Sequence, residues 1–135
     1  ETSAFRIIRK RSVMEVVTRE VTVSTASIGF HCWPEAVGER TYLSDRHRHL
    51  FHYRVTVPVA HNDRDIEFHD LLDITRSSPP LTRSEHDRSS CEDLAAEIAE
   101  TIFTNYPHLN WVRVEVTEDD EVAATLTFQQ EDIEQ

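Results

Sequence analysis

The segment HRHLFHYRVTVPV, residues 47–59, has the clearest strand pattern in the sequence. Its odd-numbered positions carry two histidines and then five aromatic or aliphatic residues, while its even-numbered positions are mostly polar. Successive residues of a strand point to opposite faces of a sheet. We therefore expect a strand with one face toward a core and with His47 and His49 at the start of that face. Pro58 has no N–H to donate, which indicates a sheet edge or a bulge at the far end.

A second strand is predicted upstream, within residues 16–31, a stretch rich in valine and threonine that ends at His31. Its valines have strand spacing, and Ile28 and Phe30 resume that spacing after a polar stretch, so the pattern allows for a bulge. A long loop with Pro34 and Gly38 follows. If the two strands form a hairpin, His31 meets the histidine pair at the mouth of this loop.

The remaining signals predict one helix and two further strands. A turn at 61–64 and a loop at 76–89 precede a helix that begins at the N-cap Ser90, has Asp93 three residues later, and ends at 105–107. One side of this helix is apolar. Strands at 111–117 and 122–128 follow, joined by an acidic turn at 118–121.

This order of elements predicts an α+β fold, in which a helix covers one face of an antiparallel four-stranded sheet. We expect a single domain over residues 1–135, with a core at about 14–128 and a tail at 129–135. A sheet of four strands leaves long unpaired edges, which favours association with further copies of the chain.

Composition excludes some classes of function. The net charge is −11, whereas binding to a nucleic-acid backbone needs a basic face, so no nucleic-acid partner is expected. No apolar run is long enough to cross a bilayer, so we expect a soluble protein without a membrane partner. Two cysteines do not make a disulfide framework, which favours a reducing, cytoplasmic setting.

The three histidines are the strongest indication of chemistry. His47 and His49 project from one face of their strand, neutral imidazole is a common zinc ligand, and His31 can supply a third nitrogen for an open zinc site. The competing interpretation is a polar strand end without a metal. His52 and His61 allow the same two interpretations, and we assign neither to a site.

Five short segments, taken in order, resemble the 6-pyruvoyl-tetrahydropterin synthase and 6-carboxytetrahydropterin synthase family, whose members have the tunnelling fold. The resemblance rests on a Phe-His strand end, a His-x-His strand, an Asp-Phe-like segment with Glu67 in place of aspartate, a helix start, and a strand ending in glutamate. These segments are Ile28–His31, His47–Val55, Asp65–Leu71, Ser90–Ala95, and Val114–Glu118 followed by Ala123 and Ala124.

This resemblance implies a fold, a cofactor and an activity. It implies one long helix and a shortened second helix on one face of the sheet, and an oligomeric barrel, most plausibly a hexamer. It implies Zn²⁺ on His31, His47 and His49, and Glu118 as the residue that binds the edge of a pterin- or purine-like ligand. The implied enzyme is a zinc-dependent lyase acting on a dihydropterin triphosphate, in a pterin or 7-deazaguanine (queuosine) pathway. In the acidic turn, substitution of Asp119 or Asp120 is expected to affect ligand binding much less than substitution of Glu118, because only one position can point inward.

The sequence departs from the family at its catalytic residues. The family's cysteine shortly before the His-x-His pair is missing from residues 42–46. Cys32 and His86 are weak candidates for catalytic roles, and Cys91 is expected to be a packing residue, although the start of a helix favours a thiolate. Two alternatives to an enzyme therefore stay open. One is a non-catalytic oligomer that binds a pterin or purine nucleotide on the same fold, and the other is a structural subunit without a small ligand.

Overall fold

The longest pairing in the structure joins strands β1 (Glu20–His31) and β2 (His47–Pro58) in an antiparallel hairpin. Its register runs without interruption from the pair Glu20 and Pro58 to the pair His31 and His47. The computed structural model describes residues 13–130. The strand predicted at residues 47–59 is confirmed, and Pro58 is its last residue. Pro58 lies beyond the part of β2 that pairs with the strand on the side away from β1.

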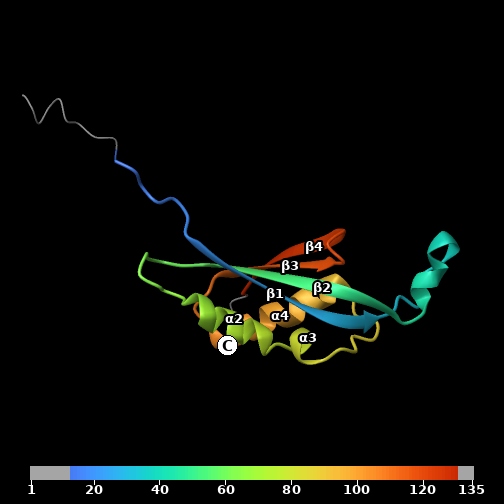
Figure 1. Ribbon diagram of the computed structural model, residues 1–135. Helices are drawn as coiled ribbons and strands as arrows, with labels where there is room; N and C mark the ends of the chain where they lie inside the picture. Colours follow the sequence, from blue (N-terminus) through green and yellow to red (C-terminus); the bar gives the residue numbers. More distant parts are fainter. Residues whose placement is uncertain (1–12, 131–135) are drawn as a thin grey trace, which may run out of the picture.

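All the predicted strands and the predicted helix are present, in the order and orientation expected. The sheet has the order β1-β2-β3-β4 and is antiparallel throughout, and the helices lie on one of its faces (Figure 1). A 3-10 helix in the hairpin loop lies beyond the end of the sheet, in cyan in Figure 1. The remaining elements are η1 (Gly38–Ser44), α2 (Phe68–Arg76), α3 (Pro79–Thr82), α4 (Cys91–Asn105), β3 (Trp111–Glu118) and β4 (Val122–Gln129).

The core lies between β2, β3 and the long helix α4. The alternation in β2 places its aromatic and valine residues on the helix-facing side, where they are fully buried. Helix α4 packs against β3 and β4, and α2 packs against β1. The main core residues are Phe51, Tyr53, Val55, Val57, Leu94, Ile98, Ile102, Val112, Val114 and Val116.

Helix α4 begins where the sequence predicts. Ser90 accepts a hydrogen bond from the backbone N–H of Asp93, and the Asp93 carboxylate accepts one from the backbone N–H of Ser90, which completes a capping box.

The segment predicted as a loop at 76–89 instead contains the short helix α3, and α2 ends at the first residue of that segment. Among residues 13–130, no helix combines the length and the apolar composition that a membrane crossing requires.

Strand β1 corrects the sequence analysis at Ile28 and Phe30. No bulge is present, because every residue of β1 pairs with one residue of β2. The helix-facing side continues from Val23 through Gly29 to His31, so Ile28 and Phe30 lie on the opposite face. The guanidinium of Arg46 covers the Phe30 ring at 3.7 Å, which explains how an aromatic residue is accommodated there.

The loop before α4 is attached to the outer edge of β1. Backbone hydrogen bonds of 2.8 Å join Phe30 to Ser84 and His86, and Cys32 to Asp87. This attachment carries the His86 side chain beneath β1, where it is 1% exposed. A Cβ at Gly29 would lie 2.5 Å from Nε2 of His86 and 3.1 Å from the Phe51 ring. Gly29 therefore leaves the space that the His86 ring occupies.

We expect Gly29→Ala to destabilise the protein by about 1–3 kcal/mol, the usual range for overpacking a tight interior. In a His86→Ala background the same change should cost less, because only the Phe51 ring, 3.1 Å from the added Cβ, then still has to move. Urea unfolding of the four proteins measures both values. An equal cost in the two backgrounds would show that His86 is not the obstacle.

Candidate metal centre

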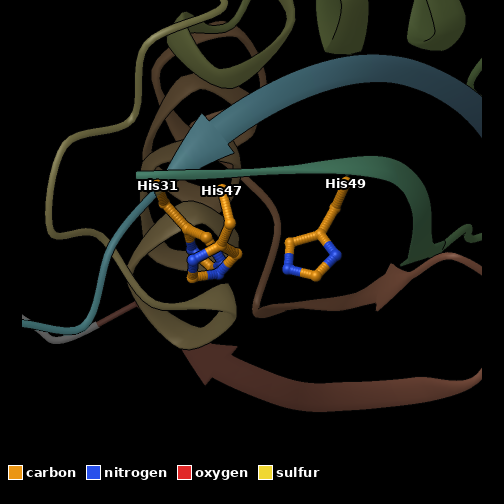
Figure 2. A group of neighbouring side chains, drawn as sticks. All are labelled: His31, His47 and His49. Atoms are coloured by element: carbon orange, nitrogen blue, oxygen red, sulfur yellow. The ribbon is translucent and has the colours of Figure 1, made fainter. Parts of the chain in front are cut away.

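Three histidines meet at the end of the β1–β2 hairpin, at the mouth of its loop, as the sequence predicts. His31 is the last residue of β1 and pairs with His47, the first residue of β2, while His49 follows on the same face. The ring centroids are 4.6–5.1 Å apart, and one nitrogen from each ring lies within 4.8 Å of the others. Figure 2 shows the three imidazoles on the same side of the two strands.

Each of the three rings has its Nδ1 against an atom that can only accept a hydrogen bond. The acceptors are the carbonyl oxygen of Ser89 for His31 at 2.9 Å, the carbonyl oxygen of Asp45 for His47 at 2.8 Å, and the Asp119 carboxylate for His49 at 2.6 Å. An acceptor at Nδ1 requires a proton there, so in the neutral ring Nε2 carries the free lone pair. Fixing the tautomer in this way is how proteins orient histidines that bind metals.

The environment of His31 keeps this ring neutral. Burial lowers its pKa most, and the neighbouring rings of His47 and His49 lower it further, while the Ser89 hydrogen bond and the charge of Glu118 raise it. The net direction is downward from the ordinary value near 6.5. His31 is therefore uncharged at neutral pH, which is the form that binds a metal ion.

Glu118 lies against the histidines. It is the last residue of β3 and pairs with Phe51. One carboxylate oxygen is 2.9 Å from Nε2 of His49, and the other is 3.9 Å from Nε2 of His31. The second oxygen also accepts a hydrogen bond from the Cys91 thiol, with a sulfur–oxygen distance of 3.2 Å. Its side chain is 23% exposed, so Glu118 is not a solvated turn residue.

A cavity of about 210 Å³ opens beside this cluster. Residues from the hairpin loop and from the start of α4 form its walls, together with two of the histidines and Glu118. Cys32 also lines the cavity and is half-buried. The walls include His31, His47, Trp33, Cys91 and Glu118.

Asp119 has a role that the sequence analysis missed. It was not expected to point into the site, but one of its oxygens contacts Nδ1 of His49 and the other accepts the backbone N–H of Leu50 at 2.8 Å. The His49 contact and then the Leu50 N–H lower the pKa of its carboxyl group. Asp119 and Asp120 both have positive φ, as in a type I′ turn. Only the β2–β3 register, which brings this turn beside His49, reveals the contact.

His86 lies outside the cavity. The Phe51 ring contacts the rings of His86, His31 and His49, with centroid distances of 5.3–5.5 Å. Nδ1 of His86 accepts a hydrogen bond from Arg83 at 3.2 Å. Burial and the Arg83 charge lower the pKa of His86. The structure therefore places this candidate in the packing beneath β1.

Cys91 is in the site, but as a thiol. Burial raises its pKa most, and the hydrogen bond to the Glu118 carboxylate raises it further. These effects outweigh the stabilisation of a thiolate that the start of α4 was expected to give.

The fold and the cluster together define a class of protein: an α+β subunit with a one-sided antiparallel sheet and three histidines at the mouth of its first hairpin. No protein-family model and no curated protein matches the sequence. Solved structures do match, and 6-pyruvoyl tetrahydropterin synthases are among them. The Plasmodium falciparum structure has a TM-score of 0.58 and 12% identity, and the match covers 84% of this chain and 99% of that one.

Two further structures of the same enzyme agree. The one from Caenorhabditis elegans has a TM-score of 0.53 and 15% identity, covering 84% of this chain and 98% of that one. The one from Plasmodium vivax has a TM-score of 0.56 and 11% identity, covering 83% and 99%. The resemblance predicted from the sequence is thus confirmed at the level of the fold, which is that of 6-pyruvoyl tetrahydropterin synthase.

The double contact of Asp119 leads to a prediction about metal affinity. An asparagine at position 119 keeps one acceptor oxygen but turns a donor NH₂ toward either His49 or Leu50. We expect Asp119→Asn to weaken metal binding by about 10–100-fold, the usual effect of losing the partner of a metal-binding histidine. Competition with a chelator measures this affinity.

Asp120→Asn is the matched control, because Asp120 is the next residue, also has positive φ, and has a side chain that is 72% exposed. Its metal affinity should stay close to that of the parent. Equal affinities for the two variants would mean that Asp119 does not orient His49.

Proposed function

We propose that this protein is a metal-dependent enzyme of the 6-pyruvoyl- or 6-carboxytetrahydropterin synthase type, with Zn²⁺ on His31, His47 and His49. The observation that carries the proposal is the hydrogen bonding that the three rings share: each Nδ1 is held by an acceptor, which leaves the lone pair of Nε2 for a metal. Three histidine nitrogens with an open fourth position are typical of catalytic zinc. When bound, the metal would polarise a carbonyl or alcohol oxygen on the substrate side chain.

The proposed substrate is a dihydropterin triphosphate, and the protein's own residues would bind and orient it. Glu118 lines the cavity and can accept two parallel hydrogen bonds from the amino-pyrimidine edge of a pterin. Trp33, on another wall of the same cavity, offers an aromatic surface to the flat ring. A pathway to pterins or to 7-deazaguanine compounds such as queuosine is proposed on the same grounds.

We also propose a closed homo-oligomer, most plausibly a hexamer, in the cytoplasm. In the described part of the chain, β1 and β4 are the edge strands, and the face of the sheet opposite the helices is mostly polar and has no helix packed on it. Val13, Met14 and Val17, before β1, are 84%, 93% and 91% exposed, which is unusual for apolar residues so close together. Two free cysteines suit a reducing compartment.

A second candidate function is capture of a pterin or purine nucleotide without turnover. It is favoured by the position of the candidate His86, which does not line the cavity, and by Cys91, whose raised pKa keeps it a thiol. One observation argues against this second candidate. Two Plasmodium vivax synthase structures are variants of a catalytic residue, and that residue is a glutamate, so this fold supports catalysis with a carboxylate.

The first test concerns the metal. Protein purified without chelators should contain up to about one zinc per chain, and His47→Ala or His49→Ala should remove most of it. His52→Ala is the control, because His52 lies on the same strand but on the opposite face. Elemental analysis of the four proteins gives the answer. Zinc content that does not change in either site variant would exclude the assignment.

The second test concerns the ligand and its turnover. A pterin should bind saturably in isothermal titration, and Glu118→Gln should weaken binding by about one to two decades, since each lost charge-assisted hydrogen bond costs about 1.5–3 kcal/mol. A zinc-dependent change in a dihydropterin triphosphate would establish the enzyme. Saturable binding without turnover would instead establish the second candidate, and absence of both would reject the pterin proposal.

A further inference from the structure

We infer that Glu118 is the fourth ligand of the metal when no organic ligand is bound, and that a ligand must displace it. This inference rests on the proposed metal centre, and it adds a second state to the site. Glu118 closes the centre in the first state and holds the ligand in the second. The argument depends on where the Glu118 oxygens lie relative to the histidine nitrogens.

The separation of the atoms fits two ligands of one ion. In a tetrahedral zinc site with bonds of about 2.0–2.1 Å, neighbouring ligand atoms are about 3.3–3.4 Å apart. The Glu118 oxygens are 2.9 Å from Nε2 of His49 and 3.9 Å from Nε2 of His31, on either side of that value. One oxygen therefore lies beside His49 and the other beside His31, so the carboxylate faces two of the three nitrogens at about the spacing of ligands to one ion.

The contact with His49 is not a hydrogen bond. Nε2 of His49 is buried and has no hydrogen-bond partner, although the Glu118 oxygen is only 2.9 Å away. The oxygen therefore lies away from the direction in which a ring N–H would point. Buried ring nitrogens normally have a partner. Because Nδ1 of His49 is already used by Asp119, an ion between Nε2 and the carboxylate accounts for both the short distance and the poor alignment.

Cys91 holds the carboxylate in this orientation. Its thiol donates to the oxygen that is farther from His49, which leaves the nearer oxygen facing the histidines. The backbone of Glu118 is fixed on both sides, by its pairing with Phe51 and by the turn in which its carbonyl accepts the N–H of Glu121 at 3.0 Å. Cys91 is thus a positioning residue, which acts through Glu118.

The two tasks of Glu118 exclude one another. A pterin edge engages both carboxylate oxygens, as a two-point contact requires. A carboxylate that turns both oxygens away from the histidine nitrogens to reach the pterin edge cannot also remain on the metal. Ligand binding should therefore open the fourth position of the metal, and the centre should stay closed while the cavity contains no ligand.

Cobalt(II) in place of zinc tests the inference, because its visible spectrum reports the number and type of its ligands. Glu118→Gln should weaken cobalt binding at least about tenfold and change the spectrum. Glu121→Gln, in the same turn and exposed, should do neither. Cys91→Ala should shift the spectrum, and Cys91→Ser, which keeps a donor, should restore it.

Pterin itself provides the second measurement, since it has no side chain that could reach the metal. Its fluorescence reports binding, and its addition should alter the cobalt spectrum of the parent but not that of Glu118→Gln. Equal affinity and an identical spectrum for the parent and Glu118→Gln would overturn the inference and leave the histidine site intact. Pterin binding without a spectral change in the parent would overturn the displacement. No cobalt binding by the parent would instead contradict the proposed metal centre itself.

Discussion

The register of the β1–β2 hairpin is the constraint on which the rest of the structure depends. Twelve consecutive residue pairs place His31 directly opposite His47, with His49 on the same face. A slip of one residue would turn every side chain of one strand to the other face. It would move His31 away from the pair and also expose the aromatic and valine residues of β2. Because burial of the core fixes the register, the same burial fixes the histidine cluster.

The two strands of the hairpin alone do not complete the site. Three other segments supply the atoms that orient the rings: the loop before β2 for His47, the segment before α4 for His31, and the β3–β4 turn for His49. The segment before α4 is itself attached to β1 by backbone hydrogen bonds. The cluster is therefore held from several directions, which gives it the rigidity that a metal centre needs.

The sequence predicts those parts of the structure that depend on local pattern. Alternation in residues 47–59 shows the strand and its buried face, and the capping box shows where α4 begins, because both patterns lie within a few residues. The role of Asp119 could not be predicted in this way, since it depends on a long-range register that brings the β3–β4 turn beside His49. The prediction was wrong for Ile28 and Phe30, because apolar residues are not always buried. Both lie on the outer face, where Arg46 covers the Phe30 ring.

Gly29 and His86 are far apart in the sequence but share one small volume beneath β1. A side chain at the first position and a ring at the second cannot occupy that volume together. Over evolutionary time the two positions should therefore change as a pair: a relative that gains a side chain at the glycine has to give up the buried imidazole. Such paired substitution would make these positions a marker for aligning distant sequences in which the short motifs of this fold are difficult to place.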